Sequence, residues 1–155
     1  MGIEIERKFL LKDDSWRQQA DAGTPYRQGY LIGAKQASVR VRIEGDKAFL
    51  NIKSMTLGVT RQEYQYPIPF DEANELLDDL CEKPLVEKTR YKIQHAGHEW
   101  EIDVFAGDNS GLIVAEVELQ SEHEAVELPP WVGIEVSDDP RYYNVNLVKH
   151  PYSTW

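Results

Sequence analysis

Charged residues of like sign recur two positions apart along this chain, each pair separated by a single residue. The first example lies near the N-terminus, where Glu4, Glu6 and Lys8 alternate with Ile5 and Arg7. Because successive side chains of a β-strand point to opposite faces, an extended segment here would place both carboxylates and the ammonium group on one face. One such strand is typical of a solvated sheet edge, so by itself it predicts only an extended segment.

The same spacing returns in other strand-like segments. The further like-sign pairs are Arg40/Arg42, Lys88/Arg90, Glu101/Asp103 and Glu116/Glu118. Neighbouring like charges on one strand face repel unless something of opposite charge lies between them. A sheet with its charged face in water remains an alternative, but such faces usually mix charged and uncharged polar residues. The pairing therefore favours a charged face that holds a ligand.

Alternation and β-branched or aromatic content predict eight strands and a fold that is mainly β with flanking helices. The expected strands are 3–11, 26–32, 37–44, 47–54, 59–68, 85–95, 98–105 and 112–120. Helices are expected at 14–20, at 71–81 with Asp71 as N-cap, at 122–127 and at 140–149 after Pro140. Short turn sequences between strands indicate an antiparallel sheet, and closure into a barrel would remove its exposed edges.

Composition limits the possible partners and location. A chain of 155 residues suits one domain, and its formal net charge of −10 argues against binding nucleic acid along its surface. The segment from Glu4 onward contains no long apolar run, so we expect neither a signal peptide nor a membrane span, and a cytoplasmic location. Cys81, the single cysteine, is expected to be a buried thiol. We expect a monomer or a homodimer.

The acidic and basic pairs call for different ligands. Clustered carboxylates without His or Cys are hard oxygen ligands, which suit Mg²⁺ or Mn²⁺ better than Zn²⁺. Clustered guanidinium and ammonium groups suit phosphate oxygens. A site that contains both therefore suits a polyphosphate that a divalent cation bridges to the carboxylates.

The type and order of the charged positions resemble the CYTH superfamily, the triphosphate tunnel metalloenzymes, and above all its short bacterial members. The segments that carry this resemblance are Glu4-Ile5-Glu6-Arg7-Lys8, Arg40-x-Arg42, Lys53, Glu63, Lys88-Thr89-Arg90, Glu101-Ile102-Asp103 and Glu116-Val117-Glu118. The resemblance covers nearly the whole chain and implies a single domain over residues 1–155. It also implies a closed eight-stranded antiparallel barrel around a hydrophilic tunnel, with apolar faces outward. The side chains expected to cover those outward faces are Leu76, Leu77, Leu80, Leu147 and Val148.

The resemblance further implies divalent-metal-dependent hydrolysis of inorganic tripolyphosphate to pyrophosphate and phosphate. The implied phosphate-binding residues are Lys8, Arg40, Arg42, Lys53, Lys88 and Arg90. The implied ligands of Mg²⁺ or Mn²⁺ are Glu4, Glu6, Glu63, Asp103, Glu116 and Glu118. The alternatives are hydrolysis of thiamine triphosphate or nucleoside triphosphates, adenylate cyclase activity, and a non-catalytic polyphosphate-binding module.

Two assignments of the proton acceptor stay open. Lys8 beside Tyr30 resembles a dyad suggested for the short members, and a metal-bound water activated by Glu4 or Glu6 is the rival. Arg7 lies on the opposite strand face and is expected to matter only for structure. Secondary candidates for the site are Arg61, Lys92 and Arg141.

Overall fold

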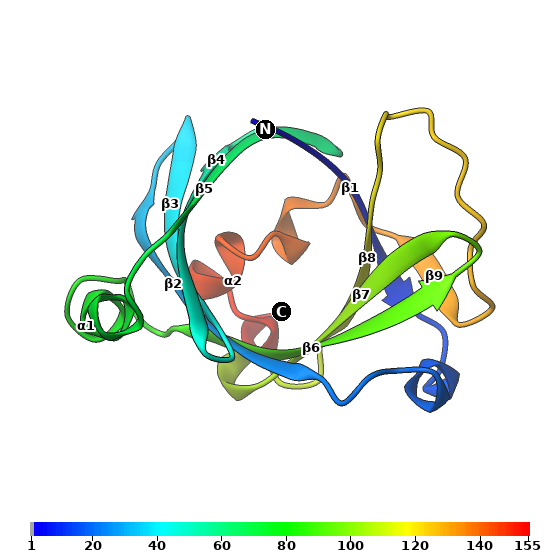
Figure 1. The fold of residues 1–155 in the computed structure, drawn as a ribbon, viewed down its shortest axis with the longest axis horizontal. Helices are drawn as coiled ribbons and strands as arrows, with labels where there is room; N and C mark the ends of the chain where they lie inside the picture. The colour runs from blue at the N-terminus through cyan, green and yellow to red at the C-terminus, as the bar shows by residue number, and fades with distance from the viewer. Residues whose placement is uncertain (1) are drawn as a thin grey trace.

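The computed structural model describes residues 2–155, which form a ring of strands with helices and loops around it (Figure 1). The strands are β1 (Ile3–Leu11), β2 (Thr24–Gly33), β3 (Ala37–Glu44), β4 (Lys47–Ser54), β5 (Thr60–Pro67), β6 (Val86–His95), β7 (His98–Phe105), β8 (Ile113–Glu118) and β9 (Val132–Glu135). The helices are α1 (Phe70–Asp79) and α2 (Asn146–Lys149), and the 3₁₀ turns are η1 (Ser15–Gln18), η2 (Gly107–Asn109), η3 (Pro140–Tyr142) and η4 (Tyr152–Thr154). All eight expected strands are present, within a few residues of their expected ends.

Antiparallel pairing closes β1 to β8 into a barrel. The strand order is β5-β4-β3-β2-β6-β7-β8-β1, and β1 returns to pair with β5. The first part of β1 pairs with β5 from Ile3 to Ile5, and the rest pairs with β8 from Glu6 to Leu10. This confirms the predicted eight-stranded barrel. The ninth strand, β9, was not predicted; it pairs with the end of β1 outside the ring.

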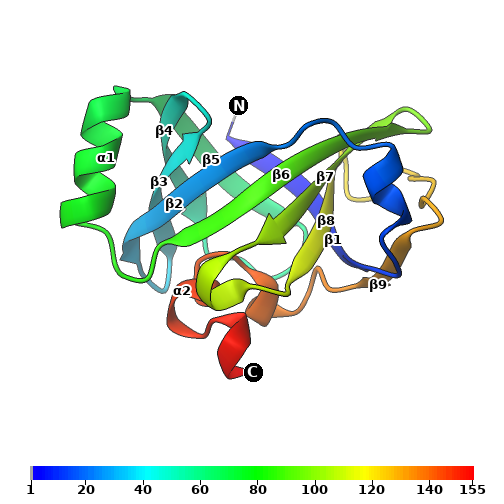
Figure 2. The same ribbon diagram turned by 90° about the horizontal axis from the view of Figure 1, so that it is seen from below.

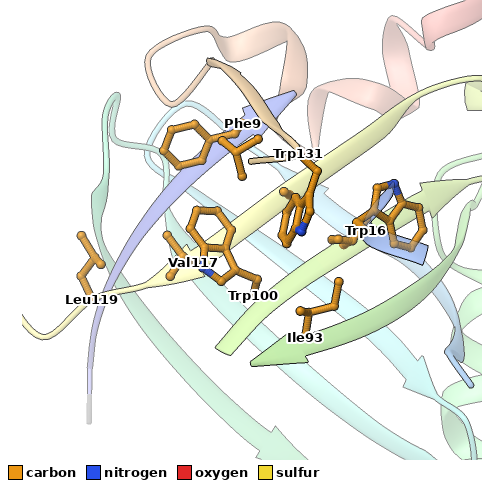
Figure 3. Close-up of a cluster of buried hydrophobic side chains, with 10 residues drawn as sticks. Phe9, Trp16, Ile93, Trp100, Val117, Leu119 and Trp131 are labelled. Carbon is orange, nitrogen blue, oxygen red and sulfur yellow. The ribbon is translucent and has the colours of Figure 1, made fainter. Parts of the chain in front are cut away.

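The outer wall of β1, β6, β7 and β8 carries the largest apolar cluster (Figure 3). Trp100 is fully buried there, with its ring centroid 5.6 Å from that of Phe9 and 5.7 Å from that of Trp131. Trp16 on η1 and Trp131 before β9 cover this wall from outside. The barrel thus buries apolar side chains between its outer wall and the surrounding loops, as the sequence predicted.

Helix α1 covers a second part of the outer wall, over β2, β3 and β4. Its Ala73 and Leu77 are fully buried against Val41 and Ile43, and the Cys81 thiol is buried in the same cluster, as predicted. Leu80 was expected to contribute to this cover, but it is 66% exposed because the helix turns it outward. The helix also begins earlier than expected.

The N-cap of α1 is Pro69, which provides no side-chain cap, so the prediction that Asp71 is the N-cap was wrong. Asp71 lies in the first turn, where a carboxylate is favoured by the helix dipole. The segment 122–127 forms a turn and an irregular stretch instead of the expected helix. There the Glu124 carboxylate accepts a hydrogen bond from the Gln120 backbone and pairs with His98, which holds the loop without a helical ladder.

The expected helix at 14–20 is only the 3₁₀ turn η1, and the one at 140–149 is divided into η3 and the single-turn α2. This C-terminal segment lies across one end of the barrel (Figure 2). Leu147 and Val148 pack against Val86, Phe105 and other inward-facing apolar residues at that end. They therefore close the barrel, and the prediction that they cover its outer wall was wrong. Within residues 2–155, no helix combines the length and hydropathy needed to cross a membrane.

Candidate active site

The barrel lumen contains a cavity of about 270 Å³, lined by side chains from all eight barrel strands and by residues 143–145 of the C-terminal segment. Alternation along each strand turns the charged residues of the predicted site toward this space. The predicted residues that line it are Glu4, Glu6, Lys8, Tyr30, Arg40, Arg42, Lys53, Glu63, Lys88, Arg90, Glu116 and Glu118. The charged strand faces thus surround an enclosed space, and the alternative of a solvated sheet face does not apply.

Asp103 is the one predicted site residue that does not line the cavity. It is fully buried behind the lining, where Oδ2 lies 2.8 Å from Lys88 Nζ and accepts a 2.8 Å hydrogen bond from Arg90 Nη2. Arg90 Nε donates to the other oxygen, Oδ1, at 2.7 Å. Although burial works against it, Arg90 and Lys88 lower the pKa of Asp103. Its place is that of a buried counterion for two cations, which corrects its expected position among the metal ligands.

Two guanidinium groups that line the cavity have buried donors without a hydrogen-bond partner in the described part of the chain. Arg40 is 5% exposed, and within residues 2–155 its Nε and Nη2 have no hydrogen-bond partner. The same holds for Nε of Arg42, although its Nη2 lies 2.6 Å from Glu44 Oε1. Burial, together with Arg40 and Arg90 nearby, lowers the pKa of Arg42. Unpaired buried donors are costly, so this arrangement favours an anion between the two arginines.

The pKa values of the two buried lysines of the lumen, Lys8 and Lys88, are shifted in opposite directions. Lys8 Nζ lies 3.2 Å from Glu116 Oε1, and although burial would lower the pKa of Lys8, Glu116 and Glu6 raise it. Burial, with Arg90 alongside, lowers the pKa of Lys88 to about 8. The raised pKa keeps Lys8 in its charged form. Within the described chain, no hydrogen bond joins Lys8 to Tyr30. Both observations argue against the assignment of Lys8 and Tyr30 as the dyad that accepts the proton.

Two carboxylates of the lumen, Glu6 and Glu118, have pKa values raised by burial and by the other carboxylates among which they lie. Burial raises the pKa of Glu6 well above its usual value, and the neighbouring Glu116 and Glu4 raise it further. The pKa of Glu118 is raised by burial and by Glu4 in the same way. Glu4 itself is paired with Lys53, whose Nζ lies 2.9 Å from its Oε1. A set of carboxylate oxygens without His or Cys fits a hard divalent cation.

No three acidic, His or Cys groups within residues 2–155 converge closely enough to hold an ion by themselves. Mg²⁺ dehydrates reluctantly and keeps several waters when it binds, so few protein oxygens are needed to hold it. The glutamates that line the cavity fit such a cation.

Several residues of the lumen were not predicted. Gln28 and Asn51 are 0% and 1% exposed on inward strand faces, and period-two alternation with Tyr30 and Lys53 would have found them. Asn144 lines the cavity from an irregular segment that has no periodicity to read. The secondary candidates Arg61 and Lys92 line the cavity, whereas Arg141 lies outside it and pairs with Asp139. Arg7, as expected, is absent from the cavity lining.

Comparison with known proteins agrees with this geometry. A model of the CYTH domain matches residues 2–151. A curated inorganic triphosphatase of Acetivibrio thermocellus is 50% identical over 155 residues, covering 100% of this chain and 99% of that protein. One of Nitrosomonas europaea is 41% identical over 148 residues, covering 93% and 95%.

Solved structures give the same result. The crystal structure of an inorganic triphosphatase, 38% identical, aligns with a TM-score of 0.66 over 94% of this chain and 93% of that chain. A protein from Pyrococcus horikoshii, 16% identical, shares the fold with a TM-score of 0.61 over 77% and 80%. With a family model over residues 2–151 and a relative that shares half of its sequence, the chain belongs to the CYTH domain family.

Proposed function

We propose that this protein hydrolyses inorganic tripolyphosphate to pyrophosphate and phosphate with a divalent cation, Mg²⁺ or Mn²⁺. The observation that carries the proposal is the set of buried guanidinium donors of Arg40 and Arg42 that have no acceptor within the described chain. Phosphate oxygens are the acceptors that such donors bind best. The relatives named inorganic triphosphatase, at 50% and 41% identity, support the same substrate.

The lining of the lumen favours an inorganic substrate over thiamine triphosphate. A thiamine ring needs an aromatic or apolar platform near the phosphates, and no tryptophan of residues 2–155 lines the cavity. Trp16, Trp100 and Trp131 are buried in the outer wall instead. The aromatic residues that do line the lumen are Tyr26, Tyr30 and Tyr143. Arg42 and Arg90 lie over the Tyr26 ring, 5.3 and 4.9 Å from its centroid. Arg61 lies over the Tyr143 ring at 4.1 Å, and Tyr30 is 4% exposed.

Catalysis in this site is mainly positioning and charge stabilisation, as is general for phosphoryl transfer. The phosphates are bound by Lys8, Arg40, Arg42, Lys53, Lys88 and Arg90. Asp103 holds Lys88 and Arg90 in place from behind. Because these cations are buried and largely fixed by neighbours, they are preorganised around the charge of the transition state.

The carboxylates that would hold the cation are Glu4, Glu6, Glu63, Glu116 and Glu118. When bound, a divalent cation neutralises phosphate charge and orients the triphosphate. During hydrolysis a water oxygen bonds to a terminal phosphorus, the bridging P–O bond breaks, and pyrophosphate leaves. Glu4 or Glu6 accepts the proton of that water in this proposal. Lys8 does not accept it, because its raised pKa keeps its ammonium group protonated.

A substrate panel tests the proposal. Purified protein with Mg²⁺ or Mn²⁺ should release phosphate from tripolyphosphate far faster than from ATP, thiamine triphosphate or longer polyphosphates. Comparable rates on all of them would refute the assignment to the inorganic substrate. Binding of tripolyphosphate without turnover under either metal would instead support a non-catalytic polyphosphate-binding module.

The role of Arg40 can be tested by Arg40→Gln. Loss of one charge-assisted hydrogen bond of about 1.5–3 kcal/mol should weaken tripolyphosphate binding by roughly tenfold or more. Calorimetric titration in the presence of EDTA measures this directly. Arg27→Gln is the matched control, because Arg27 pairs with Asp78 outside the lumen. Equal affinities for the two variants would remove Arg40 from the phosphate site.

A further inference from the structure

The C-terminal segment contributes Tyr143, Asn144 and Val145 to the lining of the lumen, and Asn144 provides the amide among them. Its neighbour Tyr143 anchors the segment: the Tyr143 hydroxyl donates to the Ser137 carbonyl at 2.8 Å and accepts from the Gly58 backbone at 3.2 Å. The guanidinium of Arg61 lies 4.1 Å from the Tyr143 ring centroid. Asn144 is therefore presented to the cavity from a fixed backbone position.

The orientation of the Asn144 amide follows from its partners. Lys88 Nζ lies 2.9 Å from Asn144 Oδ1, and Gln28 Nε2 donates to the same oxygen at 2.7 Å. An ammonium group can only donate, so the atom that faces Lys88 must be the amide oxygen. The NH₂ group of Asn144 then points away from both donors.

The Asn144 NH₂ group is available to a ligand. Within residues 2–155 no acceptor binds Asn144 Nδ2, and this atom is not among the buried polar atoms that lack a partner. Asn144 lines the cavity, and we infer that this donor, which is neither bonded within the described chain nor one of the buried unpaired atoms, faces the lumen. Beyond it the end of the barrel is filled by apolar side chains, including Val86 and Leu147, which offer no donors to a further phosphate.

We propose that Asn144 is a substrate-binding residue whose Nδ2 donates a hydrogen bond to the terminal phosphate at the closed end of the lumen. The proposal rests on the proposed function, since it takes the ligand to be a polyphosphate. A neutral donor adds a directional bond to a phosphate whose charge Lys88 already balances. Through its oxygen Asn144 also holds Lys88, so one amide connects the C-terminal closure to the phosphate site.

Two substitutions separate direct binding from support of Lys88. Asn144→Ala removes both the donor and the acceptor. Asn144→Asp keeps an oxygen for Lys88 and Gln28 but replaces the donor with a second oxygen that repels phosphate. If Nδ2 binds phosphate, Asn144→Asp should weaken tripolyphosphate binding more than Asn144→Ala does. If Asn144 only holds Lys88, the order reverses.

The measurement is calorimetric titration of tripolyphosphate with EDTA, together with KM and kcat on the metal-supplied enzyme. We expect Asn144→Ala to weaken binding about 2–12-fold, as for one neutral hydrogen bond, and Asn144→Asp to weaken it further. The loss should appear mainly in KM, because the contact forms on substrate binding. Binding by Asn144→Asp equal to or tighter than that of Asn144→Ala would overturn the proposal.

Asn146→Asp is the matched control. It adds the same charge to the same segment, where the Asn146 side chain donates to the Pro140 carbonyl at 2.8 Å and does not line the cavity. Affinity within about twofold of the original chain is expected, and a loss as large as that of Asn144→Asp would overturn the proposal. Wild-type protein that binds tripolyphosphate without hydrolysing it would count against the proposed function alone.

Discussion

Individual side chains in this lumen take their properties from the charges beside them as much as from burial. Lys8 and Lys88 are 7% and 4% exposed, yet the pKa of Lys8 is raised and that of Lys88 is lowered. The difference comes from their neighbours: Lys8 faces Glu116 and Glu6, whereas Lys88 shares Asp103 with Arg90. Sequence alone does not predict such a difference, because it depends on contacts between strands that are distant along the chain.

Glu6→Gln should stabilise the metal-free protein while it reduces turnover. The Glu6 carboxylate is partly buried beside Glu116 and Glu4; burial and these two carboxylates raise its pKa, so its ionised form is unfavourable in the folded protein. In EDTA we expect a higher Tm, by about 2–4 °C for each kcal/mol gained. Glu87→Gln, on the exposed outer face of β6, is the control and should leave Tm unchanged. A lower Tm for Glu6→Gln would refute the expected repulsion between Glu6 and the carboxylates of Glu116 and Glu4.

The same repulsion predicts how stability depends on pH. Since Glu6 and Glu118 have a raised pKa in the folded protein, their contribution is fully present below the unfolded pKa and is lost as pH rises through the folded pKa. Glu116 and Asp103 have a lowered pKa, and their contribution is lost only at more acidic pH. The Tm of metal-free protein should therefore fall as the pH rises above about 5 and through the raised pKa of Glu6. A Tm that rises steadily over this range would contradict the prediction.

At the level of elements, periodicity decided what could be predicted. Each barrel strand alternates for eight or more residues, or for six in β8, and was located within a few positions. The four-residue β9 follows Pro129 and Pro130 and is too short to show a period. Segments without regular structure, including 119–131 and 143–145, take their conformation from tertiary contacts. The missed lumen residue Asn144 lies in one of them, whereas the predicted residues on strands, apart from Asp103, line the cavity.

The contact between Arg7 of β1 and Glu135 of β9, outside the ring of strands, can be tested by substitution. Its guanidinium donates to both carboxylate oxygens of Glu135, at 2.7 and 3.0 Å, and lies 5.0 Å from the Phe9 ring centroid. The pair is partly exposed, so Arg7→Ala should cost at most about 1 kcal/mol of unfolding free energy. We expect unchanged kcat and KM on tripolyphosphate. A large loss of activity with the fold intact would place Arg7 in the site, against the prediction from strand alternation.

At the scale of the whole molecule, the barrel reverses the usual placement of polar and apolar side chains. Small barrels normally fill their interior, and charges inside one are tolerated only when they pair, stay hydrated or hold a ligand. The like-sign pairs predicted a charged strand face that holds a ligand, and the resemblance to the CYTH superfamily implied that this face lines the inside of a barrel. The apolar plug at one end was not predicted, because Val86, Phe105 and Val114 continue the inward faces of strands whose other inward residues are charged.

The ring closes through a short seam. Within residues 2–155, β1 pairs with β5 at Ile3, Glu4 and Ile5, with one backbone hydrogen bond beyond each end, whereas β6 and β7 pair over eight residues each. Hydrogen exchange should therefore be faster for amides of the β1–β5 seam than for those of β6 and β7, because short ladders open at lower free energy. Tripolyphosphate with Mg²⁺ should slow exchange at the seam, since Glu4 and Glu63 lie on its two strands. Equal protection of the seam and the β6–β7 ladder would contradict this expectation.

The pairing of β1 also has a consequence for synthesis of the chain. Strand β1 leaves the ribosome first, but its partners are residues 60–62, 114–118 and 132–135. The barrel cannot form until most of the chain has emerged, and a long-range pairing of this kind is slow to form. During that wait Glu4, Glu6, Arg7 and Lys8 keep the unpaired strand charged, which disfavours its aggregation with other nascent chains. The residues proposed to hold the metal would in this way also act as gatekeepers during folding.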